Sequence, residues 1–354
     1  MYDLTFFKNK KVLITGHTGF KGTWLSLMLE SLGSKLYGYA LEGSEETQFF
    51  KEASPAIAES QMGLIQDRKK LNKFVCSIKP DIIIHLASHS TLNKSDEITD
   101  YIFDSNVTGV VNLLEAVRKI DTVKAILIVT SDKCYLNIES DEGYTEDSRL
   151  GAQDPYSTSK ACQELITECY RKSFFAKNKL NIPIATARAS NVIGGGDYNL
   201  TRLFPYLLDC FASGKKAQIR SPKAIRPWQN VLDVLSGYLL LVQKLYESGD
   251  ADCEYSSAFN FGPEPDGFVE VQRAAEILSN EFDGAEYDIS GSLKNVIETK
   301  ILKIDSTKAK KILGWKPKYS FEDTLRMAAE FKKRQIKGES VRNIAMDFIS
   351  STHL

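Results

Sequence analysis

The chain of 354 residues lacks any run of about 18 apolar residues, and this excludes a conventional membrane-spanning helix. Its opening segment, MYDLTFFKNKK, has no apolar core long enough for a signal peptide. The net charge is only −1, so no global charge favours nucleic acid or an anionic membrane surface. We therefore expect neither a membrane nor a nucleic acid among its partners.

Cysteine is also scarce and is not clustered. The six cysteines are scattered along the chain and form no C-x-x-C pair; they stand at positions 76, 134, 162, 169, 210 and 253. This distribution favours reduced thiols over a disulfide framework or a zinc site. We expect a cytoplasmic protein without a metal. The hydrophobic fraction of 43% and charged fraction of 26% are ordinary for a globular protein of one large or two smaller domains.

A glycine-rich turn follows the first apolar segment. KKVLITG (10–16) is a short β-branched run, typical of a buried parallel strand. TWLSLMLESLG (23–33) has helical periodicity and ends at a glycine. Between them lies GHTGFKG (16–22), so the glycines stand at a strand–turn–helix junction. This context favours a dinucleotide-binding turn over a merely tight one.

Each glycine of that turn has a role in such a site. Gly16 permits the tight turn, Gly19 lets a pyrophosphate approach the backbone, and Gly22 lets helix and strand pack closely. At the adenosine end of the cofactor, Glu42 could hold the ribose hydroxyls. No arginine follows it to bind the 2′-phosphate of NADP, and this favours NAD. Asp67 could accept an adenine amino proton or could equally cap a helix.

Further apolar segments predict a parallel sheet with helices on both faces. Strands are expected at 35–41, at the start of 63–81, and at 81–88, 124–130 and 182–190; helices are expected in the rest of 63–81 and at 105–119 and 160–175. The strands read as continuous apolar runs, as in sheets that are buried on both sides. This alternation predicts a Rossmann-type, doubly wound α/β domain over 1–190.

Beyond residue 190 the pattern is less regular. We expect loops at 191–198 and 259–268, a loop leading into a helix at 226–245, a helix at 271–282, and a strand-like piece plus two short helices within 300–331. These segments predict a smaller C-terminal α/β substrate-binding lobe, mainly over 191–354. The part from about 226 to 262 is expected to return to the sheet domain.

The stretch from Thr130 to Lys160 carries the candidate chemistry. Tyr156 and Lys160 are four residues apart and share one face of a helix. A tyrosine has an ordinary pKa of about 10 and is a poor base at neutral pH, so it needs a neighbouring positive charge. The lysine ammonium can stabilise the phenolate and can also hold a nicotinamide ribose. Ser131, Asp132 and Lys133 follow a predicted strand, at the edge where such sheets bind ligands. The alternative for the first pair is a surface tyrosine beside a lysine, and the alternative for the three residues after the strand is a solvated turn.

Several motifs together resemble a known superfamily. They are TGHTGFKG, HLAS, TSDKCY, DPYSTSK, ARASNVIGGGDY, RPWQNV and ILGWKP. Over nearly the whole chain they resemble the extended short-chain dehydrogenases/reductases, and within them the CDP-glucose 4,6-dehydratases. Other nucleotide-sugar 4,6-dehydratases carry Thr-Asp-Glu where this chain has Ser-Asp-Lys, and the lysine in third place is typical of the CDP-glucose group.

The resemblance implies a lyase that converts CDP-D-glucose to CDP-4-keto-6-deoxy-D-glucose with NAD, in deoxysugar and polysaccharide biosynthesis. Carbon 4 is oxidised transiently, water is lost across carbons 5 and 6, and hydride returns to carbon 6. Tyr156, Ser131 and Lys160 belong to the oxidation. Asp132 is the candidate acid and Lys133 the candidate base of the elimination, although their adjacency opposes the required pKa shifts, upward for Asp132 and downward for Lys133.

Other positions follow from the same resemblance. The implied cofactor-binding residues are Gly16, Thr18, Gly19, Phe20, Gly22, Asp67, Leu86, Ala87, Tyr156 and Lys160. The implied substrate-binding residues are Asn191, Arg202 and Arg226, the last a guanidinium suited to a diphosphate. No metal is implied. A homodimer or homotetramer is expected, with helices 105–119 and 160–175 at the interface.

Three places depart from the family pattern. HSTLNKSD (89–96) replaces a Gln-Pro stretch and an arginine, Asn230 stands where a histidine is usual, and Ile297-Glu298-Thr299 replaces His-Glu-Ala. All are expected on the substrate side, so a dehydratase of a different nucleotide sugar is one alternative. An NAD-dependent epimerase or reductase of the same superfamily is a second, and a catalytically silent cofactor-binding scaffold a third.

Overall fold

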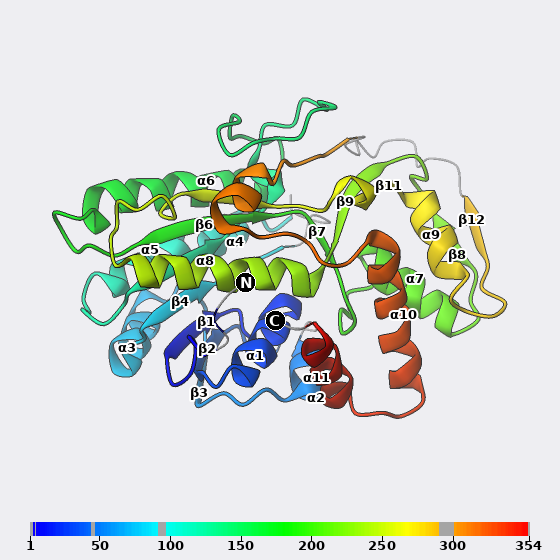
Figure 1. Cartoon of the computed structure of the whole chain (residues 1–354), viewed down its shortest axis with the longest axis horizontal. Helices are drawn as coiled ribbons and strands as arrows, with labels where there is room; N and C mark the ends of the chain where they lie inside the picture. Colours follow the sequence, from blue (N-terminus) through cyan, green and yellow to red (C-terminus); the bar gives the residue numbers. More distant parts are fainter. Residues whose placement is uncertain (1–2, 4, 44–46, 91–96, 290–300, 353–354) are drawn as a thin grey trace.

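The computed structural model describes residue 3 and residues 5–43, 47–90, 97–289 and 301–352. Within them, seven parallel strands form one sheet in the order β10-β6-β5-β4-β1-β2-β3 (Figure 1). Its strands are β1 (Lys11–Thr15), β2 (Lys35–Ala40), β3 (Glu59–Met62), β4 (Ile82–His85), β5 (Ala125–Val129), β6 (Ile184–Ala189) and β10 (Ala258–Phe261). The predicted doubly wound α/β fold is confirmed, and the strand order reverses between β1 and β4.

Helices cover both faces of this sheet. One face carries α1 (Phe20–Ser31), α8 (Val231–Ser248) and α11 (Val341–Ser351); the other carries α3 (Arg68–Ile78), α5 (Gly109–Val117) and α6 (Pro155–Tyr170). Alternate residues of β1 divide between the two cores: Val12 and Ile14 pack into the first, and Leu13 into the second. Because both faces are buried, the central strands β4 and β5 are almost wholly apolar, whereas the edge strand β3 has the polar sequence ESQM and is partly exposed.

Smaller sheets and three helices form a second lobe. One sheet contains β7 (Asn191–Ile193), β9 (Ile225–Asn230) and β11 (Phe268–Glu270), and β8 (Ala217–Ile219) pairs with β12 (Tyr287–Ile289). With α7 (Leu203–Ala212), α9 (Val271–Ser279) and α10 (Phe321–Ile336) they enclose an apolar cluster of their own. Figure 1 shows these elements at the right, at the end opposite α3, α5 and α6.

The glycine loop 194–196 joins the two lobes tightly. A Cβ atom on Gly194 would lie 2.6 Å from Val231 of α8, and one on Gly195 would collide with Phe331 of α10. Gly196 has a φ of +82°, and its Cβ atom would lie 2.5 Å from Phe49 of α2 (Gln48–Ala53). The loop is therefore confined by three elements that are distant in the sequence.

Several predicted boundaries are wrong. The third strand is β3, which ends before residue 63, and residues 63–81 contain only a helix. Residues 191–193 belong to β7, RPWQN to β9 and residues 259–261 to β10, where loops were expected. Residues 300–331 hold a π-helical turn (Ala309–Leu313) and the start of the long α10. The missed strands are short, and their pairing partners lie far away in the sequence, so no local pattern marks them.

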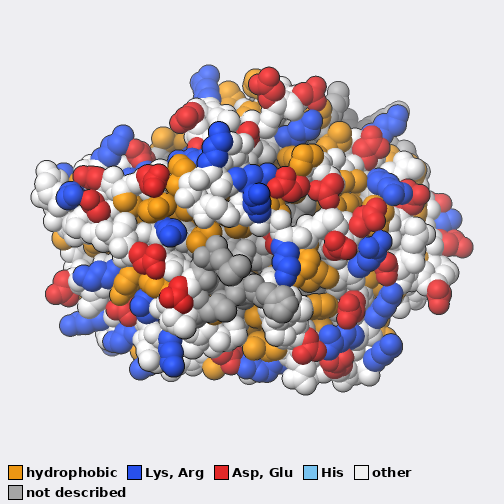
Figure 2. All heavy atoms as spheres, in the orientation of Figure 1, with side chains coloured by type: hydrophobic (Ala, Val, Ile, Leu, Met, Phe, Trp, Pro, Cys, Tyr) orange, Lys and Arg blue, Asp and Glu red, His pale blue; other side chains and the backbone are white. Residues whose placement is uncertain are grey.

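On the face drawn in Figure 2, the described residues form no large region of one charge. Figure 2 shows acidic and basic side chains interspersed over one face of the molecule. No helix in the described part of the chain is long and apolar enough to cross a membrane. All six cysteines are free, and the described residues contain no group of three or more His, Cys, Asp or Glu side chains placed to hold a metal ion.

Candidate active site

The carboxyl ends of β1 and β4 meet at the glycine turn. Gly16 has a φ of +75°, a conformation that favours glycine, and a Cβ atom there would lie 2.8 Å from the backbone nitrogen of Ala87. Leu86 and Ala87 therefore lie directly against the turn. A Cβ atom on Gly22 would collide with the carbonyl oxygen of Gly16, so the expected close packing of helix and strand is present.

The start of α1 fits the diphosphate of a dinucleotide. Gly19 is the N-cap, no side chain caps the helix, and its first turn contains no acidic residue. The N-terminus of a helix attracts anions through its amide groups and its dipole. Thr18 and Phe20 are buried beside it. The five predicted residues of this turn are thus brought together in a geometry suited to NAD.

The predicted adenosine contacts lie at the surface. Asp67 is exposed, and its Oδ1 accepts a hydrogen bond of 3.1 Å from the backbone N–H of Lys70, so it caps α3. Of its two possible roles, the structure shows the cap. Glu42 is exposed beyond the end of β2. An adenine contact for Asp67 stays a prediction.

Ser131, Asp132 and Lys133 form a compact turn at the end of β5. Ser131 Oγ donates to Asp132 Oδ1 at 3.0 Å and accepts from the backbone N–H of Lys133 at 3.3 Å, capping the 3-10 turn Asp132–Cys134. Asp132 is only 1% exposed, and its Oδ2 has no hydrogen-bond partner among the described residues. Burial raises the pKa of Asp132, against the opposing charge of Lys133, as predicted.

Tyr156 and Lys160 face this turn from α6. Asp154 caps the helix by accepting from the backbone N–H of Ser157 at 2.9 Å. Lys160 Nζ lies 5.9 Å from the centroid of the Tyr156 ring, so the predicted shared face is present. The same Nζ donates to the carbonyl oxygen of Val129 at 3.3 Å, which ties α6 to the end of β5.

Burial dominates the electrostatics of this pair. It raises the pKa of Tyr156 to about 12, against a hydrogen bond with Ser131 that lowers it. Burial also lowers the pKa of Lys160 to about 7, and the charge of Lys21 lowers it further. Ser131 therefore couples the two halves of the candidate site through its effect on the pKa of Tyr156.

Lys21 is a member of this site that the sequence analysis missed. Its Nζ lies 5.9 Å from the centroid of the Tyr238 ring. Burial lowers the pKa of Lys21 to about 8; the charge of Arg202 lowers it too, and Asp132 raises it. Lys21 is thus coupled to the cations Lys160 and Arg202 and to the buried carboxyl of Asp132, and this concentration of positive charge suits an anionic substrate. Its position inside GHTGFKG was the available signal.

The three predicted substrate residues lie on the second lobe or at its border. Arg202 donates from Nη1 to both carboxylate oxygens of Asp197 at 3.1 Å and from Nη2 to Ser90 Oγ at 3.2 Å. Its charge also lowers the pKa of Tyr156, so it is electrostatically coupled to the catalytic candidates. Asn191 begins β7, and Arg226 lies on the adjacent strand β9.

Of the three departures from the family pattern, only one lies wholly among the described residues. Asn230 Oδ1 accepts a hydrogen bond of 2.9 Å from the backbone N–H of Leu232, so Asn230 caps α8. Residues 91–96 and Ile297-Glu298-Thr299 lie outside the described residues.

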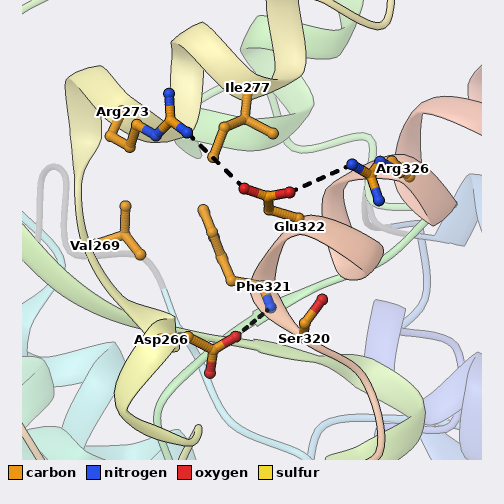
Figure 3. Close-up of a pocket in the computed structure, with 8 residues that line it drawn as sticks. All are labelled: Asp266, Val269, Arg273, Ile277, Ser320, Phe321, Glu322 and Arg326. Atoms are coloured by element: carbon orange, nitrogen blue, oxygen red, sulfur yellow. Dashed lines mark hydrogen bonds and ion pairs between the residues drawn. The ribbon is translucent and has the colours of Figure 1, made fainter.

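A separate cavity of about 360 Å³ lies in the second lobe, between β11, α9 and α10. Figure 3 shows Glu322 between Arg273 and Arg326, at 3.9 and 3.3 Å. Each arginine is thereby paired with a carboxylate. The cavity contains none of the predicted site residues, and we assign it no chemistry.

Comparison with known proteins agrees with this geometry. Residues 13–328 match the family model described as GDP-mannose 4,6 dehydratase. The chain is 38% identical over 364 residues to the CDP-glucose 4,6-dehydratase of Salmonella typhimurium, covering 99% of each chain. It is 27% identical over 354 residues to GDP-mannose 4,6 dehydratase 1 of Arabidopsis thaliana, covering 96% of this chain and 94% of that one.

Solved structures show the same fold. The dTDP-glucose 4,6-dehydratase of Bacillus anthracis, in complex with NAD, has a TM-score of 0.74 at 23% identity, covering 93% of this chain and 98% of that one. The UDP-glucose 4-epimerase of Thermotoga maritima, with UDP-glucose, has a TM-score of 0.77 at 20% identity, covering 92% and 99%. At these identities the likeness concerns the fold.

Burial of Lys160 leads to a stability prediction. The pKa of Lys160 in the folded protein, about 7, lies below the ordinary lysine value of 10.5. The unfolded chain therefore binds more protons between these two values, and stability rises with pH across that window. Lys160→Met removes this cost. We expect the variant to be more stable than the parent by about 2–5 kcal/mol near pH 6.5, with the gain shrinking towards pH 10.

Denaturant unfolding at several pH values would measure this effect. Lys172→Met is the matched control, because Lys172 lies on the π-helical turn that extends α6 and is 77% exposed. The control should leave stability unchanged at every pH. A Lys160→Met variant with the same pH dependence as the parent would contradict the assignment.

Proposed function

The chain belongs to the GDP-mannose 4,6-dehydratase family and is an NAD-dependent nucleotide-sugar 4,6-dehydratase, and we propose that it converts CDP-D-glucose to CDP-4-keto-6-deoxy-D-glucose. The observation that carries this substrate is the 38% identity, over 99% of both chains, to a CDP-glucose 4,6-dehydratase. The Ser131-Asp132-Lys133 turn supports it, since it places a second acid–base pair beside Tyr156 and Lys160.

The glycine turn would hold the cofactor. When bound, NAD would supply the hydride acceptor for oxidation at carbon 4 and the hydride donor for reduction at carbon 6. Its diphosphate would meet the start of α1, and its remaining contacts would come from Leu86 and Ala87 at the end of β4 and from Tyr156 and Lys160. The contacts assigned within the turn are Gly16, Thr18, Gly19, Phe20 and Gly22.

Oxidation begins when Tyr156, as its phenolate, takes the proton of the sugar 4-hydroxyl. The buried phenol holds its proton firmly, since its pKa is about 12. The hydrogen bond with Ser131 and the charge of Arg202 both favour the phenolate, and the Lys160 ammonium lies close to the ring. These three groups supply the stabilisation that a tyrosine base requires.

Elimination follows at carbons 5 and 6. The 4-ketone acidifies the proton on carbon 5, which Lys133 removes, and Asp132 protonates the departing 6-hydroxyl, so that water leaves and a double bond forms between carbons 5 and 6. When the hydride returns to carbon 6, Lys133 gives a proton back to carbon 5. Asp132 suits the role of acid because burial raises its pKa and thereby keeps a proton available on the carboxyl group. Lys133 lies next to it and is less buried, open to a substrate.

The second lobe would bind the nucleotide. We assign the substrate contacts to Asn191, Arg202 and Arg226, and the substrate-binding lobe to residues 191–354, with about 226–262 returning to the sheet domain at 1–190. The cationic groups Lys21 and Arg202 favour an anionic diphosphate near the catalytic turn. Arginine suits this ligand because its guanidinium can bind phosphate oxygens in pairs.

The activity can be tested directly. Incubated with CDP-glucose in deuterated water, the protein should yield a 4-keto-6-deoxy product with deuterium at carbon 5, detected by mass spectrometry and NMR. GDP-, UDP- and dTDP-sugars serve as the comparison panel. Retention of the 6-hydroxyl would favour an epimerase or reductase, and a preference for another nucleotide sugar would overturn the substrate assignment.

Lys133→Met tests the division of labour. The variant should still oxidise carbon 4, seen as a single-turnover rise in NADH absorbance, and should form product at least about 100-fold more slowly than the parent, because general acid–base groups contribute about 10²–10⁴-fold. Lys172→Met should behave as the parent. Product formation at the parental rate would show that Lys133 is not the base at carbon 5.

We further propose a homodimer or homotetramer with α5 and α6 at the interface. Leu165 on α6 is 60% exposed, and Cys169 lies exposed one turn further on, which leaves apolar surface on that face. Leu165→Glu should shift the sedimentation coefficient towards that of a smaller species. Ile336→Glu on α10, where the side chain is 59% exposed, should leave it unchanged. Equal behaviour of the two variants would contradict the proposal.

We place the protein in the cytoplasm, in deoxysugar and polysaccharide biosynthesis. The free cysteines support this location, because thiols stay reduced there. Recovery of the protein from a membrane or secreted fraction after cell fractionation would contradict it.

A further inference from the structure

A buried ion pair lies behind the candidate active site. Arg188 Nη2, on β6, is 2.8 Å from Glu164 Oε2, on α6, and the two side chains are only 5% and 4% exposed. Glu164 lies one helical turn beyond Lys160, on the same side of α6. Neither residue has a role in the chemistry described above.

Glu164 connects helix α6, which carries Tyr156 and Lys160, to the end of strand β5. Thr130 Oγ1 donates a hydrogen bond to Glu164 Oε1, and Thr186 Oγ1, from β6, donates to Oε2 at 2.7 Å. Thr130 immediately precedes Ser131. One carboxylate on the Lys160 helix therefore holds the backbone from which the catalytic turn begins.

Arg188 reaches the other end of the same turn. Its Nη1 donates to Tyr135 Oη at 2.8 Å and to the carbonyl oxygen of Glu146 at 3.0 Å. Tyr135 directly follows the 3-10 turn Asp132–Cys134, and its hydroxyl donates to Asn260 Oδ1 at 2.7 Å. The ion pair thus contacts the residue before Ser131 and the residue after Cys134.

Such a pair contributes little to stability by itself. Removing two charges from water costs about as much as their attraction returns, and well-packed apolar residues of similar size often do as well. Its geometry is demanding, however, because Glu164 accepts and Arg188 donates several directed hydrogen bonds, which form together only in one arrangement. This combination points to a role in fixing positions.

We propose that Glu164 and Arg188 are positioning residues that fix the Ser131–Lys133 turn relative to Tyr156 and Lys160. The inference rests on the proposed function, because it assigns the turn to elimination and α6 to oxidation. The Glu164–Arg188 ion pair keeps the oxidation groups of α6 and the elimination groups of the turn at fixed positions relative to each other. The ketone formed at carbon 4 therefore meets Lys133 and Asp132 without moving.

Two threonines provide matched variants. Thr130→Val removes the hydroxyl that links Glu164 to the turn and leaves the ion pair intact. Thr186→Val removes the equivalent hydroxyl on β6, from which no catalytic candidate of the turn extends. Both side chains are buried, and both lose one hydrogen bond to the same carboxylate. Thr130→Ser keeps the hydroxyl and serves as the rescue variant.

We expect the two valine variants to differ in kcat and to be equally stable. Thr130→Val should lower kcat for product formation by about 10- to 100-fold, with KM changed less than about twofold, because small displacements of catalytic groups reduce rates by up to about 100-fold. Thr186→Val and Thr130→Ser should stay within about threefold of the parent. Equal losses in Thr130→Val and Thr186→Val, or a parental kcat in Thr130→Val, would overturn the proposal.

Hydrogen–deuterium exchange provides a readout that needs no substrate. Peptides that cover residues 131–136 should exchange faster in Thr130→Val than in Thr186→Val, and Thr130→Ser should match the parent. If the parent turns over none of the sugars in the panel, the proposed function fails, and exchange alone decides on the positioning role. Equal exchange of the turn in both valine variants would overturn it.

Discussion

Parallel pairing of β1, β4 and β5 is the constraint on which the candidate site depends. Parallel strands end at the same edge of a sheet, so the glycine turn, Leu86–Ala87 and the Ser131 turn are brought side by side although they are far apart in the sequence. The reversal of strand order between β1 and β4 opens this edge to a ligand. Helix α6 then adds Tyr156 and Lys160 from outside the sheet.

Desolvation gives these groups their chemical character. Asp132, Tyr156, Lys160 and Lys21 lie close together with little access to water, and in each case burial is the largest cause of the pKa shift. Each shift favours the neutral form: the acid keeps its proton and the amines give theirs up more easily. A ligand that brings negative charge would reverse part of this balance, because it favours the protonated amines.

The sequence was most informative where function needs a local pattern. The glycine spacing and the four-residue interval between Tyr156 and Lys160 are short-range features, and the structure has both in the expected geometry. Residues such as Arg188 carry no such mark, because their partners come from β5, α6 and the loop around Glu146. Strands β9 and β10 were missed for the same reason. Asp67 had two possible roles, and only coordinates show that it caps a helix.

The division into lobes has a consequence for how the chain reaches its final state. The sheet is completed by β10, and one of its faces is covered by α8 and α11. A nascent chain of which only residues 1–190 have emerged from the ribosome would expose β6 as an unpaired edge strand and one apolar face of the sheet to solvent. Because α11 ends at Ser351, the sheet domain can bury its core fully only after the chain has been synthesised as far as this helix.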